Sequence, residues 1–165
     1  MKITKFFFAT VFLVGSVIFA QDKSFTLNDI WGRTFRTEGL QSLHAMNNGT
    51  EYSVLEKDKA SGATNIEIYN YETGEKTRTL ISSSSLRDLK SFQGYTFSND
   101  EKRILLSSEI EKIYRHSSRG VYHLYDVASK EIVKISDKKI QSPKFSPDGN
   151  RIAYVLDNNI YVLNL

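Results

Sequence analysis

The chain has 165 residues, of which 40% are hydrophobic and 25% charged, and its formal net charge is +3. This length suits one domain that holds itself together by burial of a core, since the absence of cysteine excludes disulfide bonds. Cationic and anionic residues alternate along the chain, which gives no electrostatic case for binding nucleic acid.

The first 20 residues have the pattern of a secretory signal peptide. Lys2 and Lys5 form a short basic region, and an uncharged apolar run of 15 residues extends from Phe6 to Ala20. Such a run is too short to span about 30 Å of hydrocarbon comfortably, and Ala20 is a small residue suited to a signal peptidase. An uncleaved N-terminal anchor is the alternative. Because an exported chain without cysteine is typical of bacteria, we predict a periplasmic or extracellular bacterial protein.

Cleavage after residue 20 would leave 20 cationic and 19 anionic residues, a formal charge of +1. Residues 21–40 then form a lead-in segment, and from residue 41 strand-like runs alternate with turn signals. In the run from Asn65 to Tyr71, alternation of apolar and polar residues places Ile66 and Ile68 on one face of a strand. The expected strands are 51–55, 65–71, 77–81, 104–106, 121–127, 132–135, 152–154 and 159–165.

The sequence from Tyr95 to Leu106 recurs as Pro143 to Tyr154, with Phe97 and Phe145 a period of 48 residues apart. A more divergent copy runs from Leu43 to Gly49. In the two sharper copies a phenylalanine supplies buried area, and an Asp-Glu or Asp-Gly pair reverses the chain. A repeat of this length, made of short strands and tight turns, predicts an all-β fold in which each blade of a β-propeller is an antiparallel four-stranded sheet.

The number of blades indicates that more chain is needed to close a ring. At roughly 45 residues a blade, residues 41–165 make about three blades, whereas propellers have roughly four to eight. The last expected strand ends at Leu165 without the returning strand of the two preceding blades. We therefore expect a partial propeller, the front part of a longer protein, which would expose unpaired strand edges if isolated.

The segment Tyr114-Arg115-His116-Ser117 occurs in only one of the copies, so function is sought there rather than in the repeat. The alternative to a functional role is that Arg115 is an ordinary surface arginine paired with Glu109 or Glu111. These two carboxylates lie two residues apart and would share one face of a strand. Paired carboxylates can serve acid–base chemistry, but beside Lys112 and Arg115 solvated charge is the default interpretation.

The histidines give no sign of a metal site. His44, His116 and His123 do not have the spacing of metal ligands, and His123 lies in the middle of an expected strand. His116 follows Arg115 directly and is expected to orient its loop. No cofactor is predicted.

Several of these segments together resemble dipeptidyl peptidase IV of the prolyl oligopeptidase superfamily. They are Tyr95 to Leu106, Tyr114 to Ser117, Tyr125-Asp126 and Phe145 to Gly149, and the likeness covers nearly all of residues 25–165. The resemblance implies an eight-bladed propeller that caps a C-terminal α/β-hydrolase domain with a Ser, Asp, His triad. It also implies removal of dipeptides from peptide N-termini, with proline or alanine as the second residue.

For this chain the resemblance implies one site residue. The arginine of the family's Arg-His-Ser element binds a backbone carbonyl of the substrate's N-terminal dipeptide, and that role falls on Arg115. A guanidinium stays charged and offers a fork of donors to such an oxygen. Family members commonly form homodimers, through surfaces largely outside these residues, so a homodimer of the full-length protein is compatible with the resemblance.

The chain departs from the family pattern in what it lacks. The family's paired glutamates, which bind the substrate's amino group, lie beyond the point that corresponds to Leu165. The chain contains no Gly-x-Ser-x-Gly elbow, so no catalytic residue is predicted and residues 21–165 should be inactive by themselves. The alternative function is a non-catalytic periplasmic β-propeller that binds or scaffolds other molecules, because propellers host many functions.

Overall fold

The computed structural model describes residues 24–32, 34–37 and 42–165, and the predicted signal peptide lies outside them. The chain divides into two compact segments, Met1–Gly39 and Leu40–Leu165, which are treated separately below. None of the helices in the described ranges is long and apolar enough to cross a membrane.

The short helix α2, Leu27–Trp31, lies in the first segment. A capping box begins it: the Asp29 amide donates to Oγ1 of Thr26 at 3.1 Å, and the Thr26 amide donates to the Asp29 carboxylate at 3.0 Å. Two amides that would lack partners in the first turn are thereby satisfied. This reciprocal pair accounts for a helix of only five residues in the lead-in.

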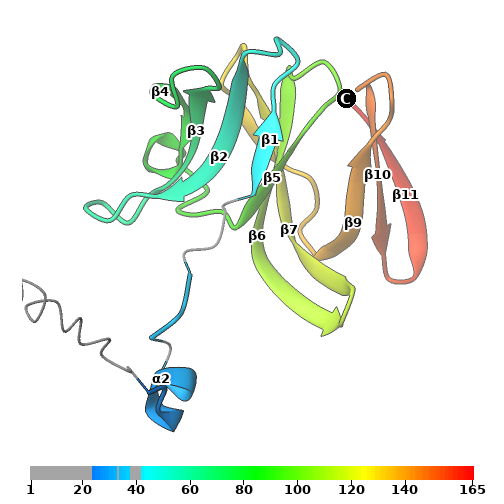
Figure 1. Ribbon diagram of the computed structural model, residues 1–165. Helices are drawn as coiled ribbons and strands as arrows, with labels where there is room; N and C mark the ends of the chain where they lie inside the picture. The colour runs from blue at the N-terminus through cyan, green and yellow to red at the C-terminus, as the bar shows by residue number, and fades with distance from the viewer. Residues whose placement is uncertain (1–23, 33, 38–41) are drawn as a thin grey trace, which may run out of the picture. The chain divides into compact units, whose positions relative to one another are not determined.

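The second segment begins with a four-stranded antiparallel sheet in the order β1-β2-β3-β4, which is the first blade (Figure 1). Its strands are β1 Leu43–Ala45, β2 Glu51–Lys57, β3 Thr64–Asn70 and β4 Lys76–Ser82. A short 3₁₀ helix, Ser83–Ser85, follows. Ile66 and Ile68 are fully buried, as their alternation in the sequence predicts.

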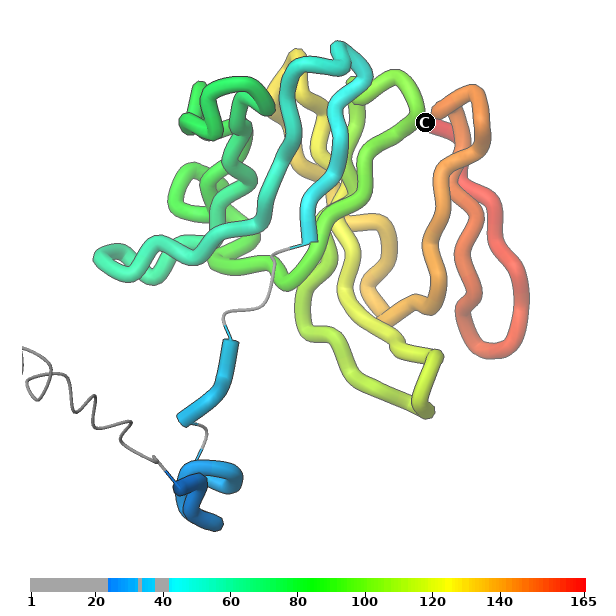
Figure 2. Tube along the Cα trace, in the orientation of Figure 1, coloured from blue at the N-terminus to red at the C-terminus, as the bar shows by residue number. Residues whose placement is uncertain are grey.

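The remaining strands form two further blades that are joined to each other. The second blade has β5 Gly94–Phe97, β6 Arg103–Tyr114, β7 Ser117–Asp126 and β8 Ile132–Lys134; the third has β9 Ile140–Phe145, β10 Arg151–Leu156 and β11 Asn159–Asn164. Strand β7 pairs with β6, β8 and β9, so the two blades share one continuous sheet of order β11-β10-β9-β7-β6-β5. The tube trace in Figure 2 follows the three successive blades. The predicted all-β fold of antiparallel propeller blades is confirmed, and the link from β7 to β9 was not predicted.

The first turn of each blade closes in the same way. The Ser98 amide donates to the Arg103 carbonyl and the Ser146 amide to the Arg151 carbonyl, both at 2.8 Å, and the Met46 amide donates to Glu51 at 2.9 Å. Positive φ angles of 71°, 57° and 71° at Gly49, Glu101 and Gly149 reverse the chain in these turns. The divergent first copy therefore has the backbone of the other two.

The core lies where the first blade packs against the second. Ile66 and Ile68 of β3 lie in one cluster with Ile104, Leu106 and Tyr125 of β6 and β7, and each of these side chains is buried. Full burial of one such aliphatic side chain contributes about 1.5–3 kcal/mol. The interface between the blades is therefore the main stabilising contact of this segment.

The two repeated phenylalanines differ in burial, contrary to the sequence-based expectation. Phe97 is 8% exposed and stacks on His44 of the first blade, with 5.0 Å between ring centroids. Phe145 is only half-buried, because the described residues place no further blade against the third. Side-chain contacts also join the blades directly: Oγ of Ser53 lies 2.8 Å from the Tyr95 hydroxyl, and Nη1 of Arg103 donates to the Gly149 carbonyl at 2.8 Å.

Candidate functional site

The hairpin of β6 and β7 is longer than any other in the described chain, and Figure 1 shows it extending past the neighbouring strands. We call its outer part, residues 109–119, the arm. Tyr114 pairs with Ser117 at its end, and Arg115 and His116 form the two-residue turn between them. Both turn residues are exposed. The sequence predicted a short strand over 104–106, whereas β6 continues to Tyr114 and carries the unrepeated element to its tip.

A β-bulge separates the arm from the rest of the blade. The pairing of β6 with β7 shifts register between Ser108 and Glu111, and Glu109 has a φ of 49°. A bulge leaves one residue without a ladder partner and bends the strand. Here the amide of Ile110 is satisfied by Oε1 of Gln93, at 2.9 Å, from the segment before β5. The arm thus leaves the blade at a bulge that is held by a contact with Gln93.

Gly120 faces the bulge on β7, where neighbouring atoms of β6 leave little room for a side chain. A Cβ atom at this position would lie 2.3 Å from Cδ1 of Ile110 and 3.0 Å from the carbonyl oxygen of Ser108. A glycine within a strand often marks a bulge or a close backbone approach. The sequence therefore contained a signal for this feature that the strand prediction did not use.

Four charged side chains gather at the base of the arm. Nζ of Lys139 lies 2.6 Å from Oε1 of Glu111 and 3.5 Å from Oε2 of Glu109, and Nε of Arg119 lies 2.9 Å from Oε2 of Glu111. Both carboxylates thus reach the same cation, although the bulge lies between them. No ion pair of Arg115 is found in the described part of the chain, so the interpretation that Arg115 pairs with one of these carboxylates is wrong.

The charged groups at the base of the arm shift one another's pKa values in the directions expected for ion pairs. The hydrogen bonds from Lys139 and Arg119 lower the pKa of Glu111, and the hydrogen bond to Glu111 raises the pKa of Lys139. Both groups are therefore ionised throughout the neutral range. The pair suits holding the strands together better than it suits proton transfer.

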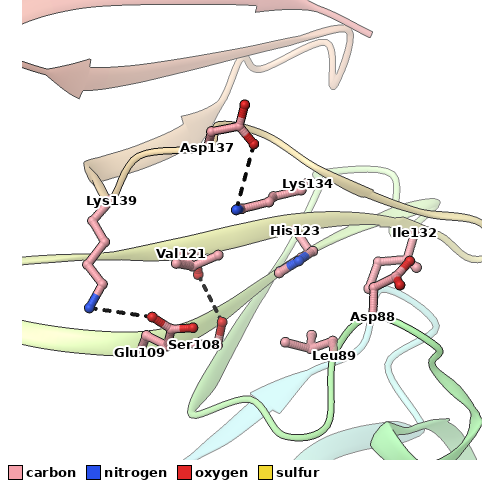
Figure 3. Close-up of a pocket in the computed structure, with 10 residues that line it drawn as sticks. All are labelled: Asp88, Leu89, Ser108, Glu109, Val121, His123, Ile132, Lys134, Asp137 and Lys139. Carbon is pink, nitrogen blue, oxygen red and sulfur yellow. Dashed lines mark hydrogen bonds and ion pairs between the residues drawn. The ribbon is translucent and has the colours of Figure 1, made fainter.

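A cleft of about 440 Å³ lies beside this cluster, between the second blade and the segment before β5 (Figure 3). His123 lines it and is 5% exposed, and its Nδ1 atom has no hydrogen-bond partner among the described residues. Burial lowers the pKa of His123, and the charge of Lys134 lowers it further, against smaller opposing effects of Asp88 and Glu109. The imidazole is therefore a neutral, buried group beneath the arm.

The positions of the His, Asp and Glu side chains show whether they could hold a metal ion. Within residues 24–32, 34–37 and 42–165, no three His, Asp or Glu side chains lie close enough together to hold a metal ion. His44 stacks on Phe97, His116 lies in the exposed turn and His123 lines the cleft. The structure thus places the three histidines apart.

The structure brings one predicted site residue to a position where it could meet a ligand. Arg115 lies exposed at the tip of the arm, beside Tyr114, which is 79% exposed. The sequence did not single out Lys139, because its partner Glu111 is 28 residues away and the charges of the region alternate throughout. Only the pairing of β7 with β9 brings them together.

Comparison with known proteins shows which family shares this architecture. Residues 98–165 match the family described as the dipeptidyl peptidase IV N-terminal region. A crystal structure of dipeptidyl peptidase 4 from Porphyromonas gingivalis superposes on 87% of the chain with a TM-score of 0.71 and 34% sequence identity. The chain belongs to the N-terminal propeller region of the dipeptidyl peptidase IV family. The match within that family spans the arm, its turn and all of the third blade.

Curated relatives in the dipeptidyl peptidase IV family agree with this placement. Prolyl endopeptidase FAP of Bos taurus is 31% identical over 85% of the chain, and dipeptidyl peptidase 4 of Felis catus is 30% identical over 86%. In each case the chain spans only 18% of the relative, and it spans 20% of the Porphyromonas gingivalis chain. The similarity therefore concerns the N-terminal blades of much longer proteins.

Proposed function

We propose that this chain is the N-terminal propeller part of an exported serine exopeptidase. The whole protein would release X-Pro and X-Ala dipeptides from the free N-termini of peptides, with the catalytic triad supplied by residues outside this chain. The observation that carries the proposal is the placement of the family's Arg-His-Ser element, Arg115 to Ser117, at the exposed tip of the arm. Relatives named as dipeptidyl peptidases from a bacterium and a mammal support the same reaction class.

In this proposal Arg115 binds the backbone of the substrate's N-terminal dipeptide. Its guanidinium has no ion pair among the described residues, so its donors are available to a carbonyl oxygen of a bound peptide. A planar guanidinium that stays charged at any working pH can hold such an oxygen with a charge-assisted hydrogen bond. The arm would thus present the arginine, and the blades would carry the arm.

The test uses the full-length protein and a Gly-Pro chromogenic dipeptide. Arg115→Ala should lower kcat/KM by about 5- to 150-fold, which corresponds to the roughly 1–3 kcal/mol of a hydrogen bond to a charged group. Arg87→Ala is the matched control, because Arg87 is also exposed but lies between the 3₁₀ helix and β5. Unchanged kcat/KM in Arg115→Ala would remove this residue from the site.

Hydrolysis of the same substrate also tests the broader proposal. A full-length protein with no dipeptidyl peptidase activity would favour the non-catalytic propeller that binds or scaffolds other molecules. Hydrolysis by residues 21–165 alone would contradict the assignment of the triad to other parts of the protein.

Export is part of the proposal, and it rests on the basic start and apolar run of residues 1–20. N-terminal sequencing of the protein from its native cells should find a mature chain that begins at Gln21, in the periplasm or the medium. A membrane-bound protein that retains Met1 would support the uncleaved anchor instead.

A further inference from the structure

The base of the arm is attached to the third blade by backbone pairing and by ion pairs. Arg119 and Gly120 of β7 pair with Gln141 and Ile140 of β9. Lys139 directly precedes β9, and its Nζ atom reaches the carboxylates of the arm. Backbone pairing and ion pairs therefore meet at the bulge itself.

We propose that Lys139 is a positioning residue for Arg115, an inference that rests on the function proposed above. By holding Glu109 and Glu111 together against the third blade, Lys139 sets the direction in which the arm leaves the bulge. Lys139 does not contact the substrate in this proposal. It acts through the arm, in which Glu111 and Arg115 are four residues apart.

The distance from the base of the arm to Arg115 is long enough for a small rotation at the base to displace Arg115. The pairing of β6 with β7 shifts register once more between Lys112 and Tyr114. Four residues of strand span at most about 13 Å, so a rotation of about 10° at the base would move the tip by up to about 2 Å. Displacements of about 1 Å in a group that positions a substrate are enough to weaken its contact with that substrate. A small change at the base of the arm is thus amplified at Arg115.

The cluster is built to resist such a rotation. Glu111 accepts from Lys139 through Oε1 and from Arg119 through Oε2, so its carboxylate is held from both sides. Lys139 is the least exposed member, with 27% of its side chain exposed against 48% for Glu111. A single exposed ion pair contributes little, but several charges in a network contribute more. Removing Lys139 leaves two carboxylates close together without their shared cation.

The test compares steady-state kinetics of full-length variants with a Gly-Pro chromogenic dipeptide. Lys139→Met should raise KM about three- to tenfold with kcat within twofold, because the lost interaction is one of binding rather than of bond breaking. Lys139→Arg should retain a wild-type KM, since it keeps the cation. Lys138→Met is the matched control: Lys138 is the neighbouring lysine, and it pairs with Asp157 in the third blade at 2.8 Å.

A double-mutant cycle with Arg115 separates positioning from a general loss of structure. If Lys139 acts through Arg115, Lys139→Met should have no further effect on KM once Arg115→Ala is present. Additive effects of the two changes would overturn the inference and leave the proposed role of Arg115 standing. If Arg115→Ala alone has no effect, the proposed role of Arg115 fails, and the inference fails with it.

Salt provides a second readout. Because exposed ion pairs are screened, the KM of the wild type should approach that of Lys139→Met between about 0.05 M and about 1 M NaCl. Lys138→Met should follow the wild type over the same range. A constant ratio between wild type and Lys139→Met would contradict an electrostatic role. Should Lys139→Met fail to fold, Glu111→Gln removes the same pair without changing the shape of the side chain, and the same outcomes apply.

Discussion

The first turns of the second and third blades are built in the same way, whereas the arm is built once. In each turn a serine hydroxyl donates to an aspartate two residues later, Ser98 to Asp100 at 2.7 Å and Ser146 to Asp148 at 2.5 Å. The arm instead depends on the bulge, on Gln93 and on Lys139. Local hydrogen bonds account for the repeated region, and distant contacts account for the single one.

The difference between the repeated blades and the single arm indicates which residues stabilise the molecule and which bind ligands. The blades bury their isoleucines against one another, while the tip of the arm carries exposed polar and aromatic side chains. Substitutions in the blades should therefore change the free energy of unfolding, and substitutions in the arm should change binding. The first prediction below tests that division, and the next two compare sites within the blades.

The largest effect is expected in the core between the first two blades. Ile104→Ala should lower the free energy of unfolding by about 2–5 kcal/mol, because Ile104 is fully buried and its truncation leaves a cavity. Ile113→Ala is the matched control in the arm, where this side chain is 38% exposed, and it should cost well under about 1 kcal/mol. Urea denaturation followed by circular dichroism measures both, and equal losses would erase the proposed division.

An intermediate effect should distinguish the two repeated turns from each other. The Ser98 hydroxyl accepts from the Arg103 amide at 3.0 Å in a site that is 2% exposed, whereas the equivalent Ser146 is half-exposed to solvent. Ser98→Ala should cost about 1–3 kcal/mol, since a buried amide loses its partner, and Ser146→Ala less, since water can replace the hydroxyl. Thermal unfolding of the two variants provides the comparison, and a larger loss in Ser146→Ala would contradict it.

The smallest effect is expected at His123, which lies beneath the base of the arm. Burial lowers its pKa in the folded state, so the unfolded state binds more protons as the pH falls below about 6.5. The contribution of His123 to stability is then present at higher pH and is lost on acidification. His123→Gln should show a shallower fall of the melting temperature between about pH 7 and pH 5. Parallel curves for wild type and variant would show that this imidazole does not titrate on unfolding.

Much of the fold was predictable because its signals are local. The alternation around Ile66 and Ile68 predicted their shared buried face, and the 48-residue repeat predicted the blades. Burial of the charged Glu67, which is 3% exposed, was not predictable from that alternation. Its carboxylate accepts from Oγ1 of Thr79 at 2.7 Å and lies 3.5 Å from Nζ of Lys76, both on the neighbouring strand β4.

The candidate site was predictable only in part. The sequence singled out Arg115 because its segment is not repeated, and the structure adds that it lies at the tip of a long hairpin. The sequence also placed Glu109 and Glu111 on one face, with solvated charge as the default interpretation and Arg115 as an alternative partner. Their partner Lys139 comes from the segment before β9, and no spacing within β6 indicates it.

The sequence by itself determined the blades and their turns, because the hydrogen bonds that close each turn join residues no more than five positions apart. Such contacts do not require a distant part of the chain to come close. Only the tertiary structure decided the base of the arm, where Gln93 lies 17 residues from Ile110 and Lys139 lies 28 residues from Glu111. The Gln93 contact exists because β5 pairs with β6, and the Lys139 contact exists because β7 pairs with β9. In the proposal above, these contacts set the direction in which the arm carries Arg115.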